Sequence, residues 1–277
     1  VSRGLGDVYK RQSLNGKELL AAPMEVNIWR APTDNDRKIK LEWKAAGYDR
    51  SKARAYDTTW EIRRGAAGCV NDESVIIHST MSVAAAALQK VLDIEAEWKV
   101  QSTGEISVTM QVKKNMEFPQ LPRFGLRLFL KKEYEGLKFY GLGPHESYVD
   151  KRRSCSHGLY ESTVEEQHED YLRPQENGSH TDCDYMVLEK EAQTFMAVSP
   201  KPFAFNVSYY TQEELTEKAH NFELEKSGNT VVCLDYGQNG IGSNSCGPKL
   251  RKEYRLDQER FTFEMMFIWK GMRGTHE

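Results

Sequence analysis

The sequence predicts an all-β fold in which one antiparallel sheet packs on another. Apolar residues alternate with polar residues along several segments, helical periodicity is scarce, and strands do not alternate with helices. The longest alternating segment, residues 92–101, has Leu, Ile, Ala, Trp and Val at every second position. Because successive side chains of a strand point to opposite faces, this pattern predicts one buried and one solvated face.

Each predicted strand follows from the same period of two. Residues 92–101 and 106–113 are joined by a turn that contains Gly104, which predicts an antiparallel hairpin. Residues 261–269 repeat the alternation, with Phe, Met and Trp on the buried face. Shorter strands are expected at residues 59–63, 74–83, 125–131, 195–199, 203–207 and 231–236.

Helices are expected in only two places, residues 40–46 and 211–219, and Gly47 is expected to end the first. The sequence has no repeat, no low-complexity segment and no linker rich in Pro, Gly or Ser. A single domain is therefore predicted over residues 14–277. Residues 1–13 share no pattern with it, and we interpret them as a non-native or truncated leader.

Charge and composition argue against several classes of partner. The 38 basic and 41 acidic residues leave a net charge of −3, so neither nucleic acid nor an anionic membrane is implied. No apolar run approaches the roughly 20 residues of a membrane span, and the first residues show no export signal. The five cysteines are scattered and never form a C-x-x-C pair, which predicts reduced thiols in the cytoplasm rather than a metal site or disulfides.

Residues 27–37, NIWRAPTDNDR, form the first of four polar clusters. A calcium loop needs acidic ligands at alternating positions, whereas the Asx residues 34–36 are consecutive. Pro32 followed by Thr and Asx residues instead favours a turn held by side chains. We predict a buried corner in which Arg30 pairs with one of the aspartates.

Residues 140–154, YGLGPHESYVDKRRS, form the second cluster, and no Gly-Lys-Ser/Thr follows its glycines as in a phosphate loop. His145 and Glu146 are adjacent and would point to opposite faces of a strand, so they cannot form a direct dyad. We favour a tight turn in which one of the two satisfies backbone groups. The alternative is a sugar-binding rim, since carboxylates, arginines and aromatic residues suit the recognition of hydroxyl groups.

Residues 171–185, YLRPQENGSHTDCDY, form the third cluster. On a strand, His180, Asp182 and Asp184 would share one face, as metal ligands do. No fourth ligand is evident, and no metal site is predicted. The Asn-Gly pair of this cluster more simply marks a turn into a strand.

Residues 239–250, NGIGSNSCGPKL, form the fourth cluster, a glycine-rich loop with Ser243, Asn244, Ser245 and Cys246 at its tip. Loops of this kind commonly carry function on a rigid scaffold. Cys246 has no basic or histidine neighbour in sequence, so nothing local argues for a reactive thiolate. These four residues are candidates for substrate contact rather than for nucleophilic catalysis.

No catalytic residue is assigned. Hydrolysis of glycosides needs two facing carboxyl groups, but no local pattern singles out a pair among the 41 acidic residues. A G-x-S-x-G elbow is also absent from the sequence. The weak candidates for sugar contact are His145, Glu146, Glu176 and His180.

Several of these segments together resemble one family, the bacterial β-galactosidases of glycoside hydrolase family two. NIWRAPTDND (27–36) and LEWKAAGYD (41–49) resemble the start of its C-terminal, small-chain domain. LPRFGLRL (121–128) and the second, third and fourth clusters resemble later segments in the same order. The resemblance runs over about residues 14–269.

The resemblance implies an antiparallel supersandwich related in fold to galactose mutarotases, and retaining hydrolysis of terminal β-D-galactosides such as lactose. It places the catalytic glutamates, with the magnesium and sodium ligands, on a barrel of which this sequence shows no trace. No cofactor or metal is therefore expected on this chain. In some members a tryptophan of the fourth cluster stacks on sugar at the aglycone side. The matching position here is Cys246, which removes the aromatic platform.

We therefore expect the C-terminal domain or small subunit of a β-galactosidase, inactive by itself, that completes the active-site wall. Its expected partners are a β-galactoside, the remainder of the enzyme and further copies in a homo-oligomer; a periplasmic location would need an export signal upstream. Two alternatives stay open. One is a free-standing mutarotase- or epimerase-like enzyme in which the weak sugar-contact candidates do acid–base work. The other is a non-catalytic carbohydrate-binding module.

Overall fold

The computed structural model describes residues 13–14, 17–64, 73–242 and 245–271. The expected all-β, antiparallel fold class is confirmed. The strands are β1 (Ser13–Leu14), β2 (Lys17–Glu18), β3 (Ala22–Asn27), β4 (Lys52–Arg63), β5 (Ser74–Ala84), β6 (Leu92–Gln101), β7 (Ile106–Lys114), β8 (Arg123–Lys131), β9 (Gly136–Gly143), β10 (Ser156–Thr163), β11 (Ser179–Lys190), β12 (Gln193–Ser208), β13 (Asn229–Gln238) and β14 (Arg260–Lys270). The α-helices are α1 (Ile39–Ala45) and α2 (Gln212–Glu217). In the described ranges, no helix has the length and apolarity needed to cross a membrane.

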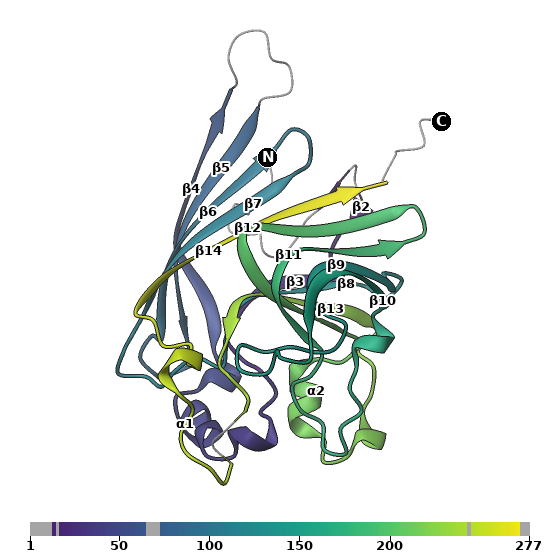
Figure 1. Cartoon of the computed structure of the whole chain (residues 1–277). Helices are drawn as coiled ribbons and strands as arrows, with labels where there is room; N and C mark the ends of the chain where they lie inside the picture. Colours follow the sequence, from purple (N-terminus) through teal and green to yellow (C-terminus); the bar gives the residue numbers. More distant parts are fainter. Residues whose placement is uncertain (1–12, 15–16, 65–72, 243–244, 272–277) are drawn as a thin grey trace.

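A twelve-stranded antiparallel sheet forms both layers of the sandwich, and strand β12 is where it divides (Figure 1). Along residues 194–198 β12 pairs with β14, and the sheet continues through β7, β6 and β5 to the edge strand β4. Along residues 204–208 it pairs instead with β13, and the sheet continues through β8 to β3. On its other side β12 pairs with β11, which leads to β9 and β10.

The hydrophobic core lies between the two layers. Phe124 of β8 meets Phe261 and Phe263 of β14 edge-to-face, with ring centroids 4.9 and 6.1 Å apart. On β6 and β7 the apolar residues at every second position are buried, as the sequence alternation predicts, except that Val100 and Ile106 are half-buried where the hairpin turns. Burial of one face per strand therefore explains the period of two.

Strand β8 differs from β6 and β7 because both of its faces are buried. The apolar residues at even positions 124–130 belong to the core. Arg123 and Arg127 point to the opposite face, yet they are only 0% and 7% exposed. The loop before β11 binds Arg123 and helix α2 binds Arg127, and the candidate site is built at the Arg123 end of this face.

The predictions for β6, β7, β14 and α1 are confirmed to within one residue at each end. Gly47 follows the end of α1 and has φ of +74°, a left-handed conformation that glycine adopts without steric cost. Helix α2 is shorter than predicted. It begins after Thr211, whose hydroxyl accepts the backbone N–H of Glu214, and it ends before Lys218, whose backbone is extended.

The prediction of separate strands at residues 195–199 and 203–207 is wrong, because both segments belong to β12. Pro200 and Pro202 lie where β12 changes its partner from β14 to β13, and residues 199–202 have no register partner in β11, β13 or β14. Proline lacks an N–H, so it is tolerated in a strand where no ladder hydrogen bond is required.

Strands β3, β9, β10 and most of β4 were not predicted. β4 is an edge strand in which almost every residue is exposed, so its sequence carries no alternation. β9 ends inside the second polar cluster, and β11 begins inside the third. For β11 the sequence predicted only the turn that leads into the strand. In both strands, polar residues that serve the loops obscure the period of the strand.

We expect Trp98→Ala to lower the free energy of unfolding by about 3–5 kcal/mol, because this side chain is fully buried and stacks on Phe267. The matched control is Trp60→Ala on β4, where the side chain is 49% exposed and the loss should stay below about 1 kcal/mol. Urea unfolding followed by circular dichroism measures both. Equal losses would contradict the placement of the core.

Candidate functional site

The four polar clusters are joined to one another by hydrogen bonds, at the end of the sandwich where α1 and α2 also lie (Figure 1). Three of these bonds run from a backbone N–H of one cluster to an oxygen of another. They are Glu176 to the Ala31 carbonyl (3.0 Å), Gly178 to the Glu146 carboxylate (2.9 Å) and Ile241 to the Asp150 carboxylate (2.9 Å). Segments as far apart in sequence as residues 30 and 239 thus form one structure, which is the candidate site.

Arg30 and Asp36 form a buried, two-pronged ion pair in the first cluster. The Nη2–Oδ1 distance is 2.8 Å, the Nε–Oδ2 distance is 3.2 Å, and the side chains are 0% and 4% exposed. Asp36 Oδ2 also accepts the backbone N–H of Thr33 at 2.9 Å, across the 3₁₀ helix Asp34–Asp36. The prediction of a buried corner clamped by Arg30 and an aspartate is confirmed.

Arg30 and Asn35 also donate to the base of the fourth cluster, residues 239–242. Arg30 Nη1 donates to the carbonyl of Asn239, and Nη2 donates to the carbonyl of Gly240 at 3.1 Å. Asn35 Nδ2 donates to the carbonyl of Ile241 at 2.6 Å. The side chains of Arg30 and Asn35 are therefore engaged by the backbone of the protein itself.

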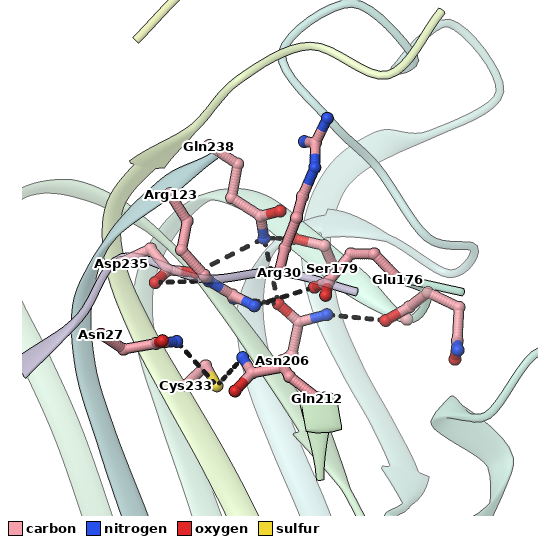
Figure 2. A network of polar contacts seen from close by, with 12 residues as sticks. Asn27, Arg30, Arg123, Glu176, Ser179, Asn206, Gln212, Cys233, Asp235 and Gln238 are labelled. Atoms are coloured by element: carbon pink, nitrogen blue, oxygen red, sulfur yellow. Dashed lines mark hydrogen bonds and ion pairs between the residues drawn. The ribbon is translucent and has the colours of Figure 1, made fainter. Parts of the chain in front are cut away.

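Figure 2 shows a second buried guanidinium, that of Arg123, on the face of β8 that points away from the core. It donates to Asp235 through Nε at 3.1 Å and Nη2 at 2.5 Å, to Glu176 at 2.9 Å and to Asn206 at 2.7 Å. Gln238 Nε2 donates to Asn206 at 3.1 Å and to Asp235 at 3.4 Å. All five side chains are buried.

Two carboxylates share the positive charge of Arg123. Burial raises the pKa of Asp235 and of Glu176, and Arg123 opposes that rise. The folded protein therefore binds the carboxyl protons of Asp235 and Glu176 more tightly than the unfolded chain does. The stability that this proton binding contributes is fully present below the unfolded carboxyl pKa and is lost as the pH rises through the folded pKa. At neutral pH the network depends on the charge of Arg123.

Glu146 anchors the loop of the second cluster. Its carboxylate is buried and accepts hydrogen bonds from Lys151 Nζ at 2.5 Å, the Tyr171 hydroxyl at 2.6 Å and the backbone of Gly178 at 2.9 Å. Burial alone would raise the pKa of Glu146, but these bonds outweigh it and hold the pKa below its ordinary value. The predicted turn, in which one of the pair satisfies a backbone group, is confirmed for Glu146. His145 is exposed, and neither residue lies on a strand.

His180, in the third cluster, is buried and bonded on both ring nitrogens. Nδ1 lies 3.0 Å from the carbonyl of Leu142, and Nε2 lies 2.6 Å from Gln167 Oε1. The ring packs against Phe139 with centroids 4.3 Å apart. Burial lowers the pKa of His180 to about 4, so the ring is neutral at neutral pH.

The expectation that His180, Asp182 and Asp184 share one face is wrong. β11 leaves its regular register with β12 after His180, and Asp182 has φ of +52°. Asp182 pairs with Arg152 near the surface, and Asp184 is exposed. Across the described ranges, no group of three or more His, Cys, Asp or Glu side chains could hold a metal ion.

The tip of the fourth cluster is described only in part. Ser243 and Asn244 lie outside the described residues. Ser245 is half-buried and Cys246 is exposed, with their Oγ and Sγ atoms 3.8 Å apart. Substrate contact by these four residues stays a prediction.

The four weak sugar-contact candidates differ in exposure. His145 is exposed, whereas Glu146, Glu176 and His180 are 7%, 4% and 1% exposed and are bonded to protein groups. A sugar would reach the three buried residues only if the surrounding loops opened. Direct contact with a sugar therefore also stays a prediction.

Sequence reasoning missed Arg123, Asp235 and Asp150 as individual residues. A signal was present for the first two. Arg123 lies two residues before the predicted strand 125–131 and shares the phase of Arg127 within it, and Asp235 lies inside the predicted apolar strand 231–236. A charge within a strand that is buried on both faces indicates an ion pair, because charged residues are almost never fully buried alone. Asp150 carried no such signal.

The fold and the site together define a β-sandwich domain whose four polar clusters meet at one end, which we call the loop end. The buried charged side chains there are paired with one another. The model of the family described as "Beta galactosidase small chain" matches residues 4–267. The chain belongs to this family. The match begins ahead of residue 14, and the domain boundary expected there stays a prediction.

Relatives of known name agree with the family. A β-galactosidase from Actinobacillus pleuropneumoniae is 40% identical over 262 residues, which are 94% of this chain and 25% of that protein. One from Staphylococcus xylosus is 37% identical over 244 residues, 87% of this chain and 24% of that protein. The chain spans about a quarter of the length of these relatives. Among solved structures, galactose 1-epimerase from Lactobacillus acidophilus NCFM has a TM-score of 0.39 at 7% identity, covering 76% of this chain and 66% of that one.

We expect Arg123→Met to cost about 3–5 kcal/mol at neutral pH, because it leaves two buried carboxylates without their counter-charge. The cost should be smaller at mildly acidic pH, since burial raises both carboxyl pKa values and protonation removes the charge. Urea unfolding at the two pH values measures both effects.

The control for this experiment is Arg152→Met, which removes an exposed pair with Asp182 whose side chains are 46% and 40% exposed. Its cost should stay below about 1 kcal/mol at either pH. A loss for Arg123→Met that is as small as the control, or that does not change with pH, would refute the role assigned to its charge.

Proposed function

We propose that this chain is the C-terminal domain or small subunit of a β-galactosidase that hydrolyses terminal β-D-galactosides with retention. One observation carries the proposal: the family match spans nearly the whole chain, while the chain corresponds to only about a quarter of its named relatives. In this proposal the catalytic glutamates and the Mg²⁺ and Na⁺ sites belong to the remaining part of the enzyme. This chain binds that part and completes the wall of the active site.

The state of the carboxylates at the loop end supports a non-catalytic role for this chain. Retaining hydrolysis needs two carboxyl groups about 5–5.5 Å apart that face the substrate. Here Glu146 is occupied by four donors, and Glu176 and Asp235 are bonded to Arg123 inside the protein. Carboxylates engaged in this way hold loops in place. In the proposal their task is to present the fourth cluster toward the aglycone side of the galactoside.

A mutarotase- or epimerase-like activity is disfavoured by the same geometry. Acid–base catalysis requires the catalytic groups within about 3 Å of the atoms that exchange protons. His180 and Glu176 are buried and bonded to protein groups, and His180 is neutral because burial lowers its pKa. Of the four candidates for that chemistry, His145 alone is exposed.

The carbohydrate-binding module gains little support. A row of aromatic side chains does run across β10, β9 and β11. Tyr140 stacks on Tyr185 with ring centroids 6.2 Å apart and meets His157 edge-on with centroids 4.7 Å apart. The rings contact one another, which leaves less ring face for a sugar. Cross-strand pairs of this kind commonly stabilise sheets without binding a ligand.

Location and assembly complete the proposal. We place the enzyme in the cytoplasm as a homo-oligomer, or in the periplasm if an export signal lies upstream. The free thiols of Cys155, Cys183, Cys233 and Cys246 support a reducing compartment. Cys69 lies outside the described residues. The homo-oligomer rests on the resemblance alone.

The 277-residue chain by itself should not hydrolyse a chromogenic β-galactoside, because its proposed role includes no catalytic carboxyl pair. Mixing it with the remaining part of a β-galactosidase should restore activity, and that part alone is the control. The proposal fails if the chain alone hydrolyses the substrate at a rate that survives repurification. It also fails if the remaining part is equally active with and without the chain.

Galactose mutarotation gives an independent test of the rival enzyme. Freshly dissolved α-galactose should equilibrate at the spontaneous rate in the presence of the chain, as followed by polarimetry, because His180 and Glu176 are buried and bonded. A rate that increases in proportion to the concentration of the chain would favour the mutarotase alternative over our proposal.

A further inference from the structure

At the base of the fourth cluster, residues 239–242, all four backbone N–H groups and the first three carbonyls are hydrogen-bonded. Pairing of this extent restricts the conformation of the segment. The four N–H groups, from Asn239 to Gly242, donate to Pro122 O (2.9 Å), Tyr254 O (2.8 Å), Asp150 Oδ1 (2.9 Å) and Asp150 Oδ2 (2.8 Å). The carbonyls of the first three residues accept from Arg30 and Asn35, as described above.

Asp150 supplies the last two of these bonds, one with each carboxylate oxygen. Both oxygens therefore bind successive backbone amides, of Ile241 and Gly242, at the point where the loop leaves the sandwich. A charged acceptor makes these bonds stronger than bonds to a neutral oxygen. Asp150 is the last described contact of this backbone before residues 243–244.

Gly240 and Gly242 leave room for the carboxylate of Asp150. A Cβ atom at Gly240 would lie 2.6 Å from Asp150 Oδ2 and 3.0 Å from the side chain of Leu250. A Cβ atom at Gly242 would lie 3.0 Å from Asp150 Oδ2. The backbone can approach the carboxylate this closely because neither residue has a side chain.

Asp150 is itself held rigidly. It lies in a turn closed by reciprocal backbone bonds between Tyr148 and Lys151, at 2.9 and 3.0 Å. Tyr148 is buried, and its hydroxyl donates to Glu146 at 3.3 Å. The ammonium group of Lys151 is bonded to Glu146, at 2.5 Å, so it anchors the turn. A fixed turn therefore presents the Asp150 carboxylate to the loop.

We infer that Asp150 is a positioning residue for the fourth cluster. Its carboxylate sets the direction in which the loop leaves Gly242, and hence the place of the exposed Cys246. In a β-galactosidase assembled from this chain, Asp150 acts on the galactoside through the loop and does not touch it. The first part of the inference stands on geometry alone, and the second part rests on the proposed function.

The position of the loop is measured on the isolated chain. A trifluoromethyl label on the Cys246 thiol, assigned by its loss in Cys246→Ser, reports the surroundings of the loop by fluorine NMR. Asp150→Ala removes both acceptors and should shift this signal. Asp150→Asn keeps one acceptor and turns an N–H donor toward a backbone N–H, so it should shift the signal as well. An unchanged signal in both variants would overturn the inference.

Two further variants keep the test sound. Asp184→Asn removes an exposed carboxylate of β11, 4.0 Å from His157, and should leave the signal unchanged. Gly242→Ala introduces a Cβ atom 3.0 Å from Asp150 Oδ2 while keeping the aspartate, and it should shift the signal even if an Asp150 variant does not fold. A signal that moves equally in Asp184→Asn would show a general effect of lost charge and would overturn the inference.

Kinetics of the assembled β-galactosidase test the second part. Asp150→Ala should raise KM for a galactoside about tenfold while kcat changes less than about threefold, because a misplaced loop weakens binding and leaves the catalytic groups in place. Asp184→Asn should change neither. If the fluorine signal moves and KM does not, Asp150 positions the loop as inferred, and the proposed contact of the loop with substrate is wrong.

Discussion

Burying the guanidinium of Arg123 is the constraint on which the loop end of this molecule depends. A buried charge costs several kcal/mol unless an opposite charge and hydrogen bonds compensate for it. Its partners come from three separate segments: Asp235 from β13, Asn206 from β12, and Glu176 from the loop before β11. All three must be in place together. We infer that the main role of the network is to determine which segments pack together, since buried ion pairs add little net stability over apolar packing.

The buried guanidinium of Arg30 extends this order to the fourth cluster. The backbone of Glu176 donates to Ala31 and so brings the first cluster against the third. Arg30, held by Asp36, then donates to the carbonyls of Asn239 and Gly240. Arg30 and Asn35, two of the polar residues of the first cluster, thus hold another segment in place. A dense polar cluster in sequence indicates that hydrogen bonds are needed, and it does not say whether a ligand or the protein supplies them.

The parts of the fold that were predictable share one physical cause. β6, β7 and β14 bury one face each, so their residues alternate and the sequence shows it. β4 is exposed along almost its whole length, so nothing selects an alternating pattern there. The Arg30 clamp was predictable because its partner is only six residues away. The partners of Arg123 are 53 and 112 residues away, and no local pattern connects them.

The sequence by itself determined that this chain is an antiparallel β protein, that residues 27–37 form a buried corner, and that its motifs resemble those of one family. Each of these follows from local spacing, because side-chain period and turn preference act over a few residues. Only the tertiary structure decided that the four clusters interlock, that Glu146, Glu176 and His180 are buried, and that Asp150 binds the loop at Ile241 and Gly242. Burial and long-range hydrogen bonds are set by strand register and topology, which bring together residues that local spacing leaves unrelated.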